Sequence, residues 1–228
     1  MNNREFEKVI GYTFRNPDFL ERALTHSSYN KEKKTHHVDN ERLEFLGDAF
    51  FDAIVSVELF LRMGKVTEGK LTKTRAQIVC ERSLAEVARQ LNVGKYINMG
   101  HGEESAGGRQ KDSILADAME AIIGALFMDG GYETAQKFVV HVFEETIEKA
   151  VNGKLFSDYK SEIQELLQAK GKGANITYEI DREEGPAHDK TFYVHLEYNG
   201  QILGSGSGKS KKEAEQNAAK AALERGDS

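Results

Sequence analysis

Three carboxylates stand at helical spacing in one short and otherwise apolar stretch of the chain. Glu41, Glu44 and Asp48 are separated by three and four residues, a spacing that places them on one face of a helix. Like charges at this spacing repel one another and weaken an isolated helix. A divalent metal ion bound between them would remove that repulsion, so the stretch suggests a metal site.

A second acidic helix supports the same chemistry. Asp117 and Glu120 lie three residues apart among small and apolar residues. Oxygen ligands from two helices suit Mg²⁺ or Mn²⁺, whereas zinc prefers histidine or cysteine. Such ions activate water and neutralise charge on a phosphodiester, so we predict phosphodiester hydrolysis. The alternative is that these carboxylates are solvated faces of amphipathic helices; their apolar neighbours favour a site.

Length and composition limit the remaining possibilities. The 228 residues are enough for one large domain or two smaller ones. The net charge of −6, with −3 in residues 1–156 and −3 in residues 157–228, counts against nucleic-acid binding unless a local basic cluster outweighs it. The single cysteine, Cys80, excludes an internal disulfide and a cysteine metal site, and we expect it to be a core thiol. The polar start and the lack of a long apolar run predict a cytoplasmic protein without a membrane span.

Residue periodicity predicts two parts of different class. Residues 1–150 are mostly helical, with one helix over 114–127 that Asp112 and Ser113 cap and Gly130 and Gly131 end, and another over 133–150. Residues 151–157 interrupt the periodicity and are expected to be a linker. A helix near 158–169 is then followed by three antiparallel strands, with a hairpin turn at Asn199-Gly200, and by a final helix over 211–223.

The first acidic stretch, residues 40–49, resembles the signature of the ribonuclease III family. Three further segments, 23–28, 67–69 and 117–121, follow in the order of that family, so the resemblance covers nearly all of residues 1–150. It implies a Mg²⁺-dependent endoribonuclease, with Mn²⁺ as a substitute, that cuts double-stranded RNA to 5′-phosphate and 3′-hydroxyl ends with short 3′ overhangs. The implied substrates are precursors of ribosomal RNA and other structured RNAs, including mRNA and tRNA.

The resemblance assigns roles to individual residues. The family's metal-binding and catalytic carboxylates match Glu44, Asp48, Asp117 and Glu120, of which Asp48 and Glu120 are expected to be the most sensitive. Glu41 and Glu68 match secondary acidic positions near the cleft; an exposed acid or a salt-bridge partner is the alternative.

Two other positions beside these carboxylates have alternative interpretations. The family resemblance implies that Phe45 inserts into a cavity of a second subunit, which makes the enzyme a homodimer; an ordinary core aromatic is the alternative. His26 stands beside two serines, but no acidic partner is placed for nucleophilic chemistry, so we expect a structural role.

Residues 158–225 resemble a double-stranded-RNA-binding domain, most specifically over 206–223. Ser210 can cap the last helix, and the positive end of that helix, with Lys209, Lys211 and Lys212 beside it, would attract a phosphate. A solvated helix end is the alternative. The resemblance implies further RNA contacts, which reach two successive minor grooves, from Gln164, Glu165 and His188.

The predicted fold is therefore multidomain: an all-α endonuclease domain over 1–150, a linker over 151–157, and a small α+β (α-β-β-β-α) double-stranded-RNA-binding domain over 158–228. A duplex-RNA-binding regulator without cleavage is the alternative function, and it would be signalled by loss of one of the four carboxylates, all of which are present. A phosphohydrolase of small esters would leave residues 158–225 unexplained.

Overall fold

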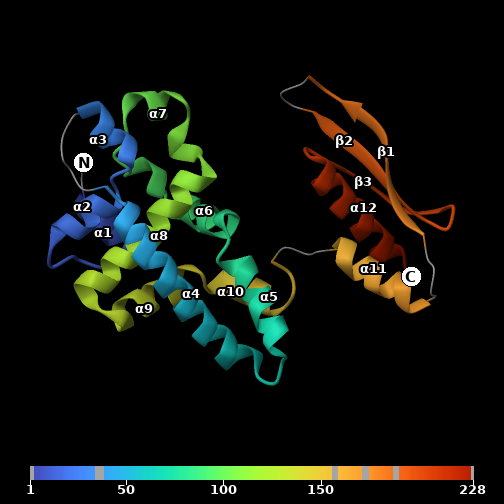
Figure 1. The fold of residues 1–228 in the computed structure, drawn as a ribbon, viewed down its shortest axis with the longest axis horizontal. Helices are drawn as coiled ribbons and strands as arrows, with labels where there is room; N and C mark the ends of the chain where they lie inside the picture. Colours follow the sequence, from blue (N-terminus) through green and yellow to red (C-terminus); the bar gives the residue numbers. More distant parts are fainter. Residues whose placement is uncertain (1–2, 34–38, 156–158, 171–174, 187–189, 227–228) are drawn as a thin grey trace. The chain divides into compact units, whose positions relative to one another are not determined.

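The computed structural model describes residues 3–33, 39–155, 159–170, 175–186 and 190–226. The chain divides into two compact units, residues 1–156 and 157–228. The described residues of the first unit form these helices (Figure 1): α1 (Asn3–Ile10), α2 (Pro17–Ala23), α3 (Ser27–Lys33), α4 (Glu41–Met63), α5 (Glu68–Ile78), α6 (Glu81–Gln90), η1 (Val93–Lys95), α7 (His101–Ser105), η2 (Gly108–Gln110), α8 (Asp112–Gly130), α9 (Tyr132–Val142) and α10 (Glu144–Val151). Within the described residues, no helix combines the length and apolarity that crossing a bilayer requires.

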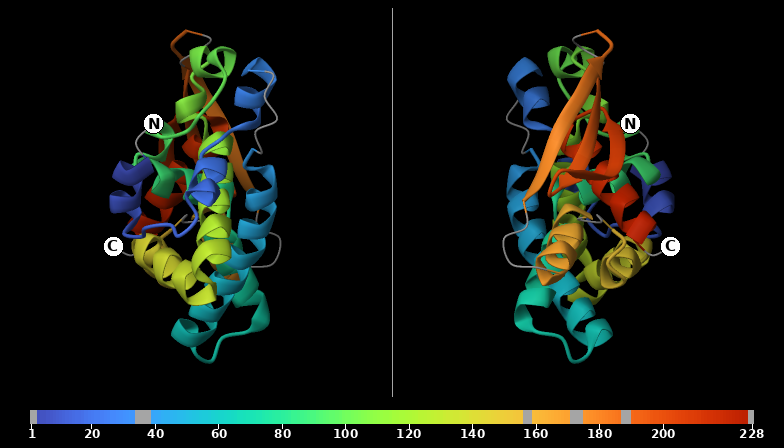
Figure 2. Two further views of the ribbon diagram at one scale, coloured as in Figure 1. Left: turned by 90° about the vertical axis from the view of Figure 1, so that its left-hand side faces the viewer. Right: turned by 90° about the vertical axis from the view of Figure 1, so that its right-hand side faces the viewer.

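Two long helices, α4 and α8, cross at the centre of the first unit and lie side by side in Figures 1 and 2. Most of α8 is buried, and an apolar helix of this kind belongs in a core. The crossing is made by two glycines, because a Cβ on Gly47 would lie 1.7 Å from the Glu120 carbonyl oxygen and one on Gly124 would lie 2.3 Å from the Leu43 carbonyl oxygen. The two backbones are therefore in direct contact, which no larger residue would allow.

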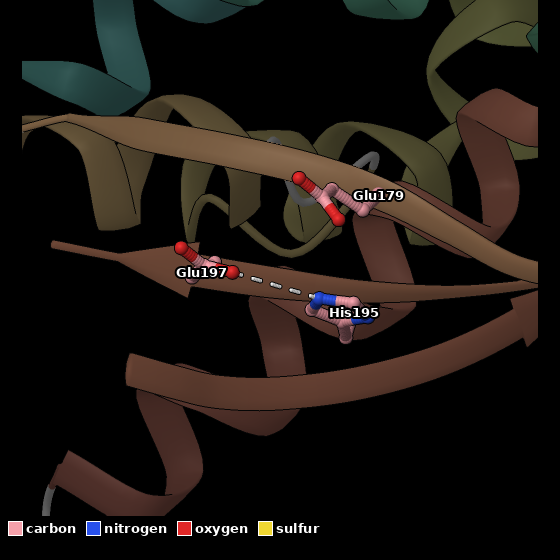
Figure 3. A group of neighbouring side chains, drawn as sticks. All are labelled: Glu179, His195 and Glu197. Atoms are coloured by element: carbon pink, nitrogen blue, oxygen red, sulfur yellow. Dashed lines mark ion pairs between the residues drawn. The ribbon is translucent and has the colours of Figure 1, made fainter. Parts of the chain in front are cut away.

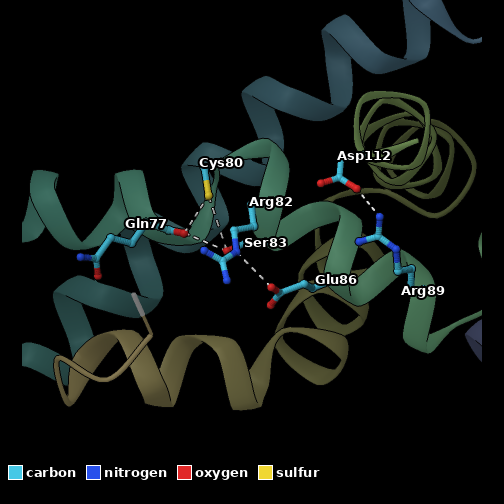
Figure 4. Close-up of polar contacts among 7 residues, drawn as sticks. All are labelled: Gln77, Cys80, Arg82, Ser83, Glu86, Arg89 and Asp112. Atoms are coloured by element: carbon cyan, nitrogen blue, oxygen red, sulfur yellow. Dashed lines mark hydrogen bonds and ion pairs between the residues drawn. The ribbon is translucent and has the colours of Figure 1, made fainter. Parts of the chain in front are cut away.

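The ends of α8 agree only partly with the predictions. Gly131, with φ 79°, follows the last turn as predicted. The predicted cap by Asp112 and Ser113 is wrong, because the helix already begins at Asp112 and the residue before it, Lys111, makes no side-chain cap. Asp112 instead forms an ion pair with Arg89 of α6 (Figure 4), which ties the start of α8 to its neighbour.

The helix predicted over 133–150 is in fact two helices. The helical run is interrupted at Phe143, which is fully buried and packs on Phe51 of α4 with ring centroids 4.7 Å apart. Arg62 of α4 then binds both carboxylate oxygens of Glu144, at 2.9 and 2.7 Å, at the start of α10. Packing against α4 therefore redirects the chain at a point where local periodicity shows no break.

Cys80 lies between α5 and α6 and is half-buried, so the expectation of a core thiol is wrong. Its Sγ donates to the Gln77 carbonyl oxygen at 3.2 Å, and the Ser83 hydroxyl donates to the same oxygen at 2.8 Å (Figure 4). The thiol thus belongs to a polar turn. The two apolar residues before it, Ile78 and Val79, belong to or pack against the core instead.

The second unit is an antiparallel sheet of three strands with both helices on one of its faces (Figure 1). Val194 and Leu196 point from the central strand into a small core that includes Ala218. The predicted hairpin is confirmed, since Asn199 and Gly200 have φ of 49° and 84°, the positive values of a tight two-residue turn. The helices and strands of this second unit are α11 (Tyr159–Lys170), β1 (Ile176–Glu184), β2 (Thr191–Tyr198), β3 (Gln201–Gly208) and α12 (Lys211–Gly226).

Candidate active site

The crossing of α4 and α8 brings together Glu44, Asp117 and Glu120, which we call the carboxylate triad. One carboxylate oxygen from each lies within 4.8 Å of the others, and all three side chains are half-buried. Gly47, one turn after Glu44, touches the backbone of Glu120, so the close contact of the helices is what sets the acids together. The structure thus joins the two acidic helices that the sequence predicted separately.

The triad carries unfavourable negative charge. Burial raises the pKa of Glu120 to about 8, and the charges of Asp48 and Glu44 add to the effect. Burial also raises the pKa of Glu44, with the charges of Asp117 and Glu41 contributing. Burial likewise raises the pKa of Asp117. Among the described residues, no lysine or arginine forms an ion pair with the triad, so neither residue type compensates the repulsion.

The triad fits a hard divalent cation. Its donors are carboxylate oxygens only, the ligands that Mg²⁺ and Mn²⁺ prefer. Asp52, one turn beyond Asp48 on α4, adds a buried carboxylate oxygen, Oδ1, that has no hydrogen-bond partner within the described part of the chain. A cation would stabilise each of these charges. The arrangement can therefore hold a metal ion and present it to an anionic substrate.

Asp48 and Glu41 lie beside the triad on α4. Both are exposed, and Asp48 is outside the triad's 4.8 Å group. The charge of Asp48 nevertheless contributes to the raised pKa of Glu120, and that of Glu41 to the raised pKa of Glu44. The acidic face predicted for α4 therefore extends from the half-buried triad to the solvent.

Glu68 is not brought to the triad within one chain. It lies at the start of α5, after the far end of α4, and its Oε1 accepts a hydrogen bond of 2.7 Å from the Thr72 hydroxyl. Glu44 and Met63 are about 28 Å apart along the helix at 1.5 Å per residue. Any role of Glu68 in a cleft with the triad therefore requires a second chain.

Two acidic residues near the triad were missed at the level of sequence. Asp52 raises the pKa of Glu120, and its spacing of four residues from Asp48 was a signal that could have found it. Glu81, at the start of α6, raises the pKa of Asp117. No local pattern points to Glu81, because only the packing of α6 on α8 brings it near.

His26 has the structural role expected for it. Its Nδ1 is 2.8 Å from the Ser28 hydroxyl oxygen, which also accepts a hydrogen bond of 3.0 Å from the Gly100 amide. The serine therefore joins the start of α3 to the start of α7. The charge of His26 also partly offsets the raised pKa of Asp117, an influence on the triad that sequence reasoning did not foresee.

Phe45 is 79% exposed, so the alternative of a core aromatic is excluded. Met128 of α8 is a second exposed apolar residue. Beside them, Leu43 and Leu46 help to line a cavity of about 190 Å³, together with Phe19, Arg22, Asp39, Arg42 and Met128. One face of the first unit thus carries both an exposed aromatic side chain and an apolar cavity.

In the second unit, the start of α12 carries the lysine cap, which we define as Lys209, Lys211 and Lys212. All three residues are exposed, and the Ser210 hydroxyl accepts a hydrogen bond of 3.2 Å from the Glu213 amide, which confirms the predicted cap. Gln164 is exposed on α11. The side chain of Glu165 and the whole of His188 lie outside the described residues.

Comparisons with known proteins agree with this architecture. Residues 16–146 match the family described as Ribonuclease-III-like, and residues 159–225 match the double-stranded RNA binding motif. The chain is 48% identical over 225 residues to Ribonuclease 3 of Clostridium perfringens, covering 99% of this chain and 94% of that protein. It is 46% identical to Ribonuclease 3 of Caldanaerobacter subterraneus, covering 95% of each. The nuclease domain of ribonuclease III from Campylobacter jejuni matches with a TM-score of 0.60 and 42% identity over 63% of this chain and 97% of that structure.

A helical nuclease domain followed by a double-stranded-RNA-binding domain defines an endoribonuclease that acts on duplex RNA. The chain belongs to the ribonuclease III family. Enzymes of this family are in general metal-dependent, and the carboxylate triad supplies acidic groups that can bind a metal ion.

Proposed function

We propose that this ribonuclease is Mg²⁺-dependent, with Mn²⁺ able to replace Mg²⁺, and that it leaves 5′-phosphate and 3′-hydroxyl ends with short 3′ overhangs. Its proposed substrates are precursors of ribosomal RNA and other structured RNAs, including mRNA and tRNA. The observation that carries the proposal is the half-buried carboxylate triad of Glu44, Asp117 and Glu120. When bound there, Mg²⁺ would activate a water molecule and stabilise charge on the phosphate.

The acidic residues have two proposed roles: some bind the metal ion, and others face the substrate. Glu44, Asp117 and Glu120 are held by two helices in backbone contact, so they form a rigid set of ligands. Asp48 is exposed beside them, and we assign it to the side of the centre that an incoming phosphodiester meets. Glu41 lies one turn before Glu44, and its negative charge raises the pKa of Glu44.

The two units take separate tasks in this proposal. Residues 1–150 form the catalytic domain, residues 151–157 the linker, and residues 158–228 the RNA-binding domain. The lysine cap binds phosphates at the start of α12, where the helix dipole adds to the lysine charges. Gln164, Glu165 and His188 are assigned to minor-groove contacts.

The exposed aromatic and the cavity support a homodimer. An isologous interface pairs the same patch on both chains, so a surface with both a protruding group and a cavity can complement itself. We assign Phe45 of one chain to the cavity lined by Leu43, Leu46 and Met128 of the other. Two triads would then face one duplex, each cutting one strand, and Glu68 would reach the cleft from the second chain.

Cleavage assays on matched substrates test the proposal. A perfectly paired RNA duplex, its separate strands and the equivalent DNA duplex would be incubated with Mg²⁺, with Mn²⁺ and with a chelator. We expect metal-dependent cutting of the RNA duplex alone, with 5′-phosphate ends. Binding of the duplex without cutting in either metal would instead identify a duplex-RNA-binding regulator.

A further inference from the structure

A second group of metal-ligating side chains lies on the open face of the sheet in the second unit. Glu179 of β1 and His195 and Glu197 of β2 form this sheet-face cluster (Figure 3), and one ligand atom from each lies within 4.8 Å of the others. Because Val194 and Leu196 point into the core, His195 and Glu197 point to the opposite face. Glu179 stands directly opposite His195 in the strand register.

The imidazole of His195 is held in one orientation. Its Nδ1 lies 2.7 Å from Asp181 Oδ1, and the pairing of β1 with β2 has an irregularity between Ile180 and Arg182 that contains Asp181. A carboxylate only accepts hydrogen bonds, so Nδ1 donates to Asp181, and in a neutral imidazole Nε2 is then the nitrogen that can bind a metal ion. Nε2 lies 4.0 Å from Glu197 Oε2, and the His195 side chain is only 12% exposed. Nε2 therefore lies on the side of the Glu197 carboxylate, as the dashed line in Figure 3 marks.

Among the described residues, no lysine or arginine neutralises the acids of the cluster, and His195 is a cationic partner of Asp181 and Glu197 only when its ring is protonated. Arg182 pairs with Glu184 at 2.7 Å, and Lys190 pairs with Glu183 at 2.7 Å. In the described ranges of the chain, no lysine or arginine nitrogen lies within 4.0 Å of the Glu179 or Glu197 carboxylates. The cluster therefore combines two carboxylates that have no lysine or arginine partner with an imidazole nitrogen, and this distinguishes it from a purely acidic surface.

We propose that Glu179, His195 and Glu197 bind one divalent transition-metal ion, for which Zn²⁺ is the best match. An imidazole nitrogen with two carboxylate oxygens and one water completes the tetrahedral set that zinc prefers, whereas the oxygen-only triad suits Mg²⁺. In a tetrahedral site the ligand atoms would be roughly 3.3 Å apart, so the 4.0 Å separation of Nε2 and Oε2 needs only small side-chain rotations. Asp181 is the positioning residue, as is usual for a ligating histidine.

Bound at this cluster, the ion links the edge strand β1 to the central strand β2. It ties the free face of the sheet together on the side opposite α11 and α12, and it neutralises part of the acidic charge there. The inference does not depend on nuclease activity, because none of its residues belongs to the carboxylate triad or the lysine cap.

The test is a calorimetric titration of the full chain with Zn²⁺ in excess Mg²⁺, which occupies the oxygen-only triad. We expect His195→Gln to bind one Zn²⁺ fewer than the wild type. His141→Gln, which removes an exposed histidine of α9, is the matched control and should bind as the wild type does. Equal stoichiometry and affinity for His195→Gln and the wild type would overturn the proposal.

A second set of variants guards against a folding defect in His195→Gln. Glu197→Gln keeps the imidazole and should weaken Zn²⁺ binding, and Asp181→Asn should weaken it about tenfold. Co²⁺ serves as a spectroscopic probe, because its visible absorption bands report binding to the imidazole. Asp181→Asn should show these bands only at a higher Co²⁺ concentration than the wild type, and His195→Gln should not show them at any concentration. Identical Co²⁺ spectra for all chains would also contradict the site.

Discussion

The two units of this ribonuclease use charge in opposite ways. In the first, Glu120 is half-buried among other carboxylates, and its pKa is raised to about 8. In the second, the exposed Glu183 of β1 pairs with Lys190, and the hydrogen bond from this lysine lowers its pKa. Carboxylates that are buried together without a lysine or arginine repel one another, and a metal ion can relieve that repulsion, whereas an exposed carboxylate is screened by water and paired with lysine. Glutamate thus belongs to a half-buried cluster that could hold a metal ion at Glu120, and to an exposed ion pair at Glu183.

The largest expected effect comes from removing a charge from the triad. Glu120→Gln should reduce cleavage of duplex RNA by about a thousandfold or more, because the site loses several kcal/mol of its support for the metal and the reacting phosphate. Duplex binding should stay unchanged, since the lysine cap belongs to the other unit. Single-turnover cleavage and a filter-binding assay measure the two properties. Glu133→Gln, on an exposed position of α9, is the control; cleavage by Glu120→Gln at the wild-type rate would refute the assignment.

The helix crossing is the next target. Gly47→Ala should destabilise the first unit by about 3 kcal/mol, because the new Cβ would lie 1.7 Å from the Glu120 carbonyl oxygen and would force α4 and α8 apart. Thermal unfolding measures this loss, and cleavage should fall with it. Gly69→Ala in α5 is the matched control, since a Cβ there meets nothing within 4 Å; it should leave the Tm unchanged or slightly higher. Equal Tm values for the two variants would show that the crossing tolerates a side chain.

Duplex binding by the exposed lysine cap of the second unit should weaken as the salt concentration rises. Lys211→Ala combined with Lys212→Ala should weaken duplex binding about tenfold and reduce the slope of log affinity against log salt by up to about 2, since each lysine neutralises one phosphate. Titrations at several salt concentrations measure the slope. Lys220→Ala, farther along α12 and near Glu224, is the control. An unchanged slope in the double variant would remove the lysine cap from the RNA interface.

The smallest effect concerns the pH dependence of stability without metal. The pKa of Glu120 is about 8 when folded against its ordinary 4.5, so the folded state holds more protons than the unfolded state between these values. Stability should therefore fall as the pH rises from about 4.5 to 8. At this half-buried position we expect the loss to be about 1–2 kcal/mol after solvent screening. In EDTA, the Tm of Glu120→Gln should fall by roughly 3–6 °C less than that of the wild type between pH 5 and 8.5. Parallel curves of Tm against pH for the two proteins would contradict the raised pKa.

Much of the architecture followed from local patterns. Helical spacing of apolar residues and the alternation around Val194 and Leu196 predicted the helical unit and the three-stranded sheet. Asn199-Gly200 predicted its turn because few residue pairs adopt two consecutive positive φ values. The break at Phe143 was missed, because it arises from packing on α4 and carries no turn residue.

The chain's own order of residues determined which acids share a helix face, since that depends only on 3.6 residues per turn. It also determined the lysine cap, because a cap and its lysines are neighbours in the chain. Only the tertiary structure decided that Glu44 meets Asp117 and Glu120, because the contact of Gly47 with α8 sets that distance. It also decided that Phe45 is exposed and that Cys80 lies in a polar turn. Burial and distances between remote residues arise from how helices cross, which no local pattern contains.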